Sequence, residues 1–89
     1  MNYLVYDLGF LEKGRIIEVT LSAQANVKLM STLDYSYYKK GLSHNYYGGW
    51  VKASPFRIAV PERFQHWYVT VDLGGYEGSV SASVTVLSE

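Results

Sequence analysis

The sequence predicts an all-β protein: a single antiparallel β-sandwich or flattened barrel of about seven strands, with one short helix. Apolar and polar residues alternate with a period of two through several segments, the pattern of strands that bury one face and expose the other. Glycine and proline residues separate these segments, as they do at turns. The chain has 89 residues, which suits one β-sandwich domain over residues 1–89.

The alternation predicts five strands in chain order, over residues 15–21, 25–29, 56–60, 67–73 and 80–86. Every second side chain in each is apolar, so one face can pack against a second sheet. Two further strands are expected over 2–7 and within 45–52, where the alternation is less regular. The apolar positions predict the core: Ile17, Val19, Leu21, Val27, Leu29, Phe56, Ile58, Trp67, Val69, Val71, Val84 and Val86.

Turn-forming residues mark the ends of these strands. Gly14 closes a turn before the strand at 15–21, and Pro55 and Pro61 flank the short strand at 56–60, where proline is tolerated. The glycine-rich run 74–78 separates the last two strands and predicts a hairpin loop.

Residues 34–40 depart from the alternation and predict one short helix. Asp34 is a candidate N-cap, Lys39 and Lys40 stand in the last turn, and Gly41 follows. An acidic residue at the start and basic residues at the end both interact favourably with the helix dipole, and glycine commonly follows the last helical residue.

Composition and charge argue against several classes of protein. Eight Lys and Arg balance eight Asp and Glu, so a nucleic-acid partner is not expected. The chain has no cysteine, which excludes disulfides, thiolate metal sites and cysteine nucleophiles. No stretch approaches the ~20 apolar residues of a membrane helix, and residues 1–7 do not resemble a signal peptide. We therefore expect a cytoplasmic protein without membrane association.

Five stretches of the sequence resemble a known family, and they include a Tyr-Tyr-Gly-Gly and a His-Trp-Tyr-Val element. The stretches are residues 18–21, 25–30, 46–49, 54–55 and 66–75. With them the sequence resembles a small bacterial family classed as a domain of unknown function, whose members stand alone or precede TIR-type (Toll/interleukin receptor) signalling domains. The resemblance implies a compact β-sandwich and a sensing or interaction module, and it implies no catalytic residues. The chain would then be a complete small protein or the N-terminal piece of a longer one.

The middle of the chain supplies the candidate binding residues. Residues 35–61 contain four Lys and Arg, no Asp or Glu, and many aromatic residues. Cations beside aromatic faces suit a planar or phosphate-bearing ligand, and Gly48 and Gly49 would let it approach backbone amides. The candidate ligand- or partner-binding residues are Lys39, Lys40, His44, Tyr46, Tyr47, Trp50 and Lys52. In the alternative interpretation, the tyrosines only pack and the lysines only keep a loop soluble.

No arrangement of residues in the sequence predicts catalysis or metal binding. His66 and Asp72 share one side of a predicted strand but lie roughly 20 Å apart, too far for one to orient the other. A metal held by His44 and His66 would need a further ligand. Tyr35 and Lys39 have the spacing of short-chain dehydrogenases, but the glycine fingerprint of a dinucleotide fold is missing. We therefore expect no enzyme, no cofactor and no metal site.

Two non-catalytic functions fit the sequence. The first is a binding or interaction module, alone or as the sensing domain of a bacterial signalling protein, with a phosphate-containing small molecule or an acidic protein surface as its partner. The second is a self-associating structural module, a homodimer that covers the exposed edges of its sheets.

Overall fold

The computed structural model describes residues 3–61 and 65–87. Within them it contains seven strands and one helix: β1 (Tyr3–Leu11), β2 (Ile16–Leu21), β3 (Ala25–Ser31), α1 (Thr32–Lys39), β4 (Tyr47–Val51), β5 (Phe56–Ala59), β6 (Gln65–Asp72) and β7 (Ala82–Val86). The predicted fold class is confirmed. In this part of the chain we find no helix with the length and apolar character needed to cross a membrane.

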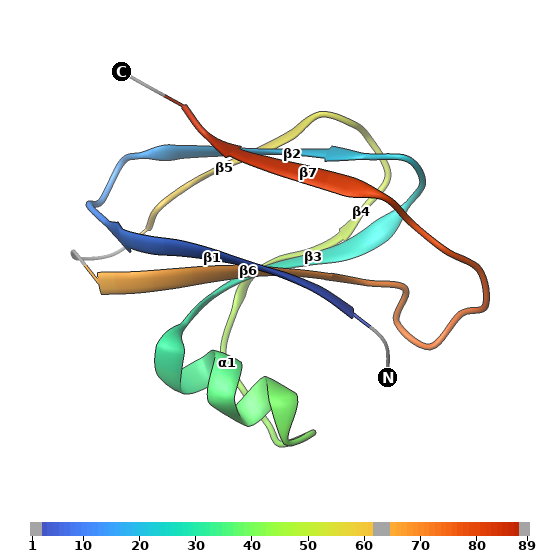
Figure 1. The fold of residues 1–89 in the computed structure, drawn as a ribbon, viewed down its shortest axis with the longest axis horizontal. Helices are drawn as coiled ribbons and strands as arrows, with labels where there is room; N and C mark the ends of the chain where they lie inside the picture. Colours follow the sequence, from blue (N-terminus) through green and yellow to red (C-terminus); the bar gives the residue numbers. More distant parts are fainter. Residues whose placement is uncertain (1–2, 62–64, 88–89) are drawn as a thin grey trace.

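The strands form two antiparallel sheets that pack face to face (Figure 1). The larger sheet has the order β1-β6-β3-β4, and the smaller has the order β5-β2-β7. The sheets share no strand among the described residues, so the architecture is the sandwich and not the flattened barrel. α1 lies on the outer face of the four-stranded sheet, against β3 and β6.

The core between the sheets follows the alternation of the sequence. Seven predicted core residues are fully buried: Ile17, Val19, Val27, Leu29, Trp67, Val69 and Val71. The other five are partly buried and pack against them: Leu21, Phe56, Ile58, Val84 and Val86. Most of these lie on β5 and β7, the edge strands of the smaller sheet, where one side has no neighbouring strand. Each fully buried aliphatic side chain contributes about 1.5–3 kcal/mol.

The first strand is longer than predicted. β1 continues past Asp7 to Leu11 because a bulge between Asp7 and Gly9 shifts its register against β6. The Asp7 carboxylate accepts the backbone N–H of Gly9 at 2.9 Å, and Gly9 has a φ of 71°. A bulge reverses which residues face the core, so the two halves of β1 do not share one alternating pattern. β7 is shorter than predicted and begins at Ala82.

The helix starts earlier than predicted, and its N-cap is Ser31 instead of Asp34. Ser31 Oγ accepts the backbone N–H of Asp34 at 3.3 Å, and the Ser31 hydroxyl donates to Asp34 Oδ2 at 3.0 Å. The prediction was wrong because β3 passes into α1 without a loop, which hides the cap within the strand pattern. The end agrees with expectation: Gly41 has a φ of 74°, and Leu42 N donates to Tyr37 O at 2.9 Å, as in a Schellman motif.

Candidate functional site

Eight aromatic side chains from β1, β6, α1 and the loop after α1 form a continuous row. Consecutive ring centroids lie 4.6 to 6.4 Å apart. In order along this ring row they are Phe10, His66, Tyr68, Tyr35, Tyr3, Tyr38, His44 and Tyr46. Stacked and edge-to-face pairs of this kind add about 0.5–1.5 kcal/mol each beyond the area that they bury. The ring row therefore holds α1 and the following loop against the sheet.

Lys28 of β3 joins one end of the ring row. Its Nζ lies 5.1 Å from the centroid of Tyr38 and 4.5 Å from that of Tyr46, and 3.2 Å from His44 Nε2. An ammonium group can only donate hydrogen bonds, so His44 Nε2 accepts. His44 Nδ1 then carries the hydrogen and donates it to the Leu42 carbonyl at 3.0 Å. Lys28 was not among the predicted binding residues, although its polar position in an alternating strand places it on this face.

Asp72 of β6 is a buried carboxylate that joins three parts of the fold. Its side chain is only 2% exposed. Oδ2 accepts the Tyr38 hydroxyl of α1 at 2.6 Å. Oδ1 accepts the backbone N–H of Gly74 at 2.8 Å and Nδ2 of Asn26 at 3.3 Å. These hydrogen bonds offset the cost of burying a charge and fix the loop after β6 against β3 and α1.

Stability should fall at alkaline pH because of two phenols in the ring row. Burial, followed by the hydrogen bond to Asp72, raises the pKa of Tyr38 far above its usual value. Burial and the hydrogen bond with Tyr3 raise the pKa of Tyr35 to about 12. In the unfolded chain both phenols ionise near pH ~10. The stabilisation that their raised pKa values give to the folded state is therefore complete below that pH, and it is lost as the pH rises above it.

We therefore expect the midpoint of urea unfolding to decrease between about pH 9 and pH 11. Tyr38→Phe, which removes one of the two phenols, should make that decrease smaller. An unfolding midpoint that stays constant over this range in the unsubstituted protein would contradict the burial of these hydroxyl groups.

His66 pairs with Asp7 of the neighbouring strand. The distance from His66 Nε2 to Asp7 Oδ1 is 2.5 Å. The hydrogen bonds from the Gly9 backbone and from His66 hold the pKa of Asp7 below its usual value. His66 and Asp72 thus have different partners, as their separation along β6 requires. Among residues 3–61 and 65–87, no three His, Cys, Asp or Glu side chains are grouped so that they could hold a metal ion.

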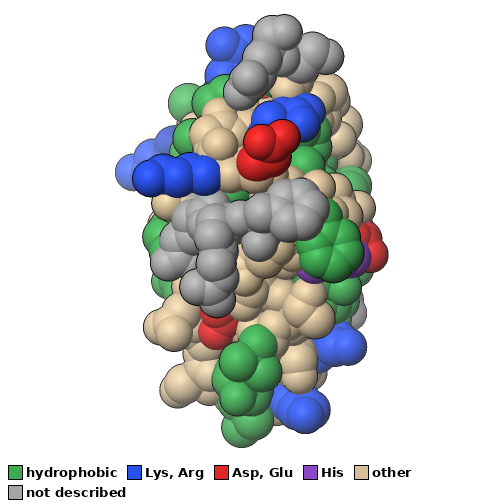
Figure 2. All heavy atoms as spheres, turned by 90° about the vertical axis from the view of Figure 1, so that its left-hand side faces the viewer, with side chains coloured by type: hydrophobic (Ala, Val, Ile, Leu, Met, Phe, Trp, Pro, Cys, Tyr) green, Lys and Arg blue, Asp and Glu red, His purple; other side chains and the backbone are tan. Residues whose placement is uncertain are grey.

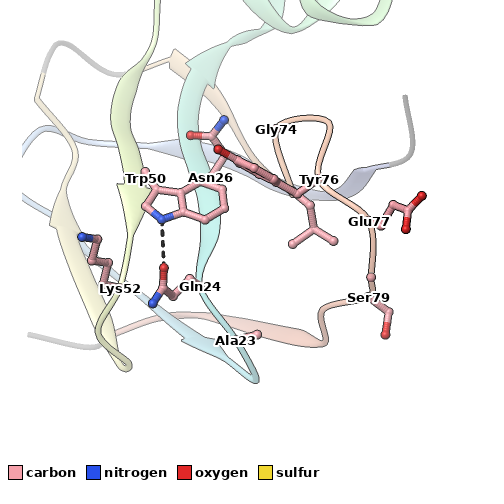
Figure 3. Close-up of a pocket in the computed structure, with 11 residues that line it drawn as sticks. Ala23, Gln24, Asn26, Trp50, Lys52, Gly74, Tyr76, Glu77 and Ser79 are labelled. Atoms are coloured by element: carbon pink, nitrogen blue, oxygen red, sulfur yellow. Dashed lines mark hydrogen bonds between the residues drawn. The ribbon is translucent and has the colours of Figure 1, made fainter.

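A pocket of about 960 Å³ lies where β4 meets the turn before β3 and the loop between β6 and β7 (Figure 3). We call it the rim pocket; its lining includes Gln24, Asn26, Trp50, Lys52, Gly74 and Tyr76. Trp50 and Tyr76 are 40% and 74% exposed, and their ring centroids lie 5.8 Å apart with the planes at 61°. Trp50 Nε1 donates to Gln24 Oε1 at 3.2 Å. Figure 3 shows the two rings directed toward each other and Glu77 directed away from them.

The seven predicted binding residues lie in different parts of the fold. Trp50 and Lys52 line the rim pocket. His44 and Tyr46 belong to the end of the ring row that contacts Lys28. The sequence predicted these four residues as parts of one surface, whereas the structure describes two separate environments for them.

The other three predicted residues lie elsewhere. Lys39 lies with its Nζ 5.0 Å from the ring centroid of Tyr35, and Lys40 is the exposed C-cap residue of α1. Tyr47 packs edge-on against Trp67 at 6.3 Å. None of the three lines the rim pocket as the structure describes it.

Residues 35–61, which contain no Asp or Glu, do not form a surface that lacks acidic side chains. Asp34 Oδ1 accepts the backbone N–H of Asn45, and Glu77 as well as Lys52 lines the rim pocket. On the face shown in Figure 2, basic and acidic side chains are interspersed. Residues outside the stretch therefore supply negative charge to the surfaces that it helps to form.

Sequence reasoning missed Tyr76, Gln24 and Asn26 as residues of the rim pocket. Tyr76 lies within the glycine-rich run that was interpreted as a hairpin loop; that prediction was wrong, because β6 and β7 lie in different sheets and the run connects the two. An aromatic side chain between glycines at a loop tip is costly to expose, and this was the available signal. Gln24 and Asn26 gave none, because their roles depend on which strands pair with β3.

Comparison with known proteins identifies a family and no activity. No curated protein and no solved structure matches the chain. One family model matches it over residues 1–89, which confirms the resemblance to an uncharacterised family. The chain belongs to the family described as a domain of unknown function (DUF1883).

Proposed function

We propose that the protein is a non-catalytic binding module and that the rim pocket is its recognition site. The observation that carries this proposal is the pair of exposed, touching rings of Trp50 and Tyr76 at one hollow in the surface. Exposed apolar surface costs about 25 cal/mol per Å² relative to burial, and a ligand that covers the rings recovers this free energy. Trp and Tyr are also enriched among the residues that dominate binding energies.

The rim pocket is held in its shape before any ligand arrives. A Cβ atom at Gly74 would lie 3.6 Å from Asn26 Nδ2 and 3.8 Å from Trp50 Cζ3, so the loop backbone is close to both side chains. Asp72 Oδ1 accepts hydrogen bonds from both Gly74 and Asn26. A preformed site loses less conformational entropy on binding, which favours recognition without rearrangement.

The family resemblance supports a place for such a module in signalling. The resemblance seen in the sequence is to a bacterial family whose members stand alone or precede TIR-type signalling domains, and a sensing domain needs a ligand site of its own. We propose a cytoplasmic sensing role on that basis, with ligand binding at the rim pocket as the input.

Tryptophan emission tests the proposal because the two tryptophans differ in exposure. Trp67 is 1% exposed in the core, so a ligand in the rim pocket should change the emission of Trp50 and protect it from acrylamide. Titration with a panel of nucleotides, neutral saccharides and peptides should include at least one compound with this effect. Tyr76→Ala keeps the reporter and removes half of the ring pair, so it should abolish the response.

Paired Lys39→Ala and Lys40→Ala substitutions serve as the matched control for the same titration. Both residues are predicted binding residues that lie outside the rim pocket, so the response should survive their replacement. A response that disappears in this variant and persists in Tyr76→Ala would place the site on α1 and contradict the proposal, as would a panel without any response.

Self-association is a second candidate function, with its own supporting observation. Leu33 of α1 and Leu42, which follows it, are large hydrophobic residues exposed to solvent, and β4 is an edge strand of its sheet. A second copy of the chain could cover either feature. Sedimentation velocity over a dilution series should then show a dimer at high concentration that Leu42→Ser weakens. A monomer at every concentration would remove this candidate.

A further inference from the structure

We infer that the ligand of the rim pocket is a neutral saccharide. This inference rests on the proposed function and goes beyond it by naming the chemical class of the ligand. Lys52 and Glu77 are the charged side chains among the described residues that line the pocket, and their formal charges cancel. A nucleotide would bring at least two negative charges to one lysine and would be repelled by Glu77. The charge balance therefore favours a ligand without net charge.

The two rings fit a ligand that has an apolar face and a polar edge. The planes of the Trp50 and Tyr76 rings meet at 61°, and their centroids lie 5.8 Å apart. One of these side chains can therefore cover a face of a cyclic ligand while the other contacts the edge of that ligand. A pyranose presents C–H groups on its faces and hydroxyl groups around its edge. Trp and Tyr combine an apolar body with a polar tip, which matches both parts. A flat base would gain stacking from only one of the two rings.

Amide groups at the same place match the hydroxyl groups of a saccharide. Gln24 Oε1 accepts from Trp50 Nε1, which leaves the Nε2 hydrogens of Gln24 to donate. Asn26 Nδ2 donates to Asp72, which leaves Asn26 Oδ1 to accept. Neither remaining atom has a partner among the described residues. A hydroxyl group both donates and accepts, so one type of ligand group can pair with each of them.

Proline-rich peptides also pack against Trp and Tyr side chains, but the polar groups of this pocket favour a saccharide. Proline has no N–H, so a run of prolines cannot donate to Asn26 Oδ1. Burying an acceptor without a donor costs about 1–3 kcal/mol. Saccharide hydroxyl groups avoid that cost.

A nitrogen-15 NMR titration of the full chain tests the inference. The probes are galactose, mannose, cellotriose and the trimer of N-acetylglucosamine, with ATP and decaproline as the competing classes. At least one saccharide should shift the indole N–H signal of Trp50 and saturate in the millimolar range, while the signal of Trp67 stays in place. Tyr76→Ala and Gln24→Ala should each weaken this binding about tenfold or more. Tyr46→Ala, which removes an exposed ring outside the pocket, should leave it unchanged.

The outcomes separate this inference from the proposed function. If ATP or decaproline shifts the Trp50 signal and no saccharide does, the saccharide inference is overturned and the binding proposal stands. If no probe shifts it, both are overturned. Saccharide binding that survives both Tyr76→Ala and Gln24→Ala would lie elsewhere and would also overturn the inference. The apo signal of Trp67 reports whether each variant is folded.

Discussion

Replacement of Asp72 by alanine is expected to destabilise the fold by about 3 kcal/mol or more. The substitution removes the acceptor of three hydrogen bonds and leaves their donors in place: the hydroxyl of Tyr38, the backbone N–H of Gly74 and the amide of Asn26. A buried donor without an acceptor keeps its full desolvation cost. Urea unfolding followed by the emission of the buried Trp67 measures the loss.

Two further variants serve as comparisons for Asp72→Ala. Asp72→Asn keeps the shape and one oxygen, so its loss should be intermediate. Glu77→Ala removes an exposed carboxylate close by in the chain and should change stability by no more than about 0.5 kcal/mol. Equal stabilities of Asp72→Ala and Glu77→Ala would show that the hydrogen bonds of Asp72 contribute nothing to the free energy of unfolding. Because Gly74 and Asn26 also line the rim pocket, Asp72→Ala should weaken ligand binding as well.

Gly48→Ala is expected to destabilise the protein by about 3 kcal/mol or more. A Cβ atom at Gly48 would lie 2.2 Å from the carbonyl oxygen of Val27 on β3, a backbone atom that cannot rotate away. Gly48 also has a φ of 117°, which alanine adopts only with strain. The substitution should push β4 from β3 and move Trp50, so ligand binding should fall together with stability.

Gly49→Ala is the matched control for Gly48→Ala. Gly49 also has a positive φ, 148°, but a Cβ atom there would meet nothing within 4 Å. Its replacement should therefore cost only the backbone strain, about 1–3 kcal/mol. The difference between the free energies of unfolding of the two variants isolates the steric overlap. Variants of equal stability would contradict the close approach of Gly48 to β3.

The fold could be predicted because sandwich strands show their period in the sequence. Each strand of a two-sheet sandwich buries every second residue, so Ile17, Val19, Val27 and Leu29 identify their own side of the sheet. The errors lie where the period is interrupted. The bulge at Gly9 hid the second half of β1, and the direct passage from β3 into α1 hid the N-cap Ser31.

The candidate site was only partly predictable because it depends on strand pairing. Asn26 lies opposite Trp50 on one side and opposite Asp72 on the other, and these contacts join strands far apart in the chain. Period-two alternation assigns a residue to a face, but it does not say which strands are neighbours. The sequence therefore identified Trp50 and Lys52, and the register of the sheet was needed to add Asn26.

A fragment screen mapped by NMR tests most directly whether the rim pocket is the recognition site. The library should combine monosaccharides, nucleosides and small peptides, and the backbone and side-chain amide signals should locate each bound fragment. We expect the bound fragments to cluster at Trp50, Tyr76 and Gln24, with saccharides among them. Fragments that gather instead around Lys28 and His44 at the end of the ring row, or that leave the Trp50 signals unchanged, would contradict the account.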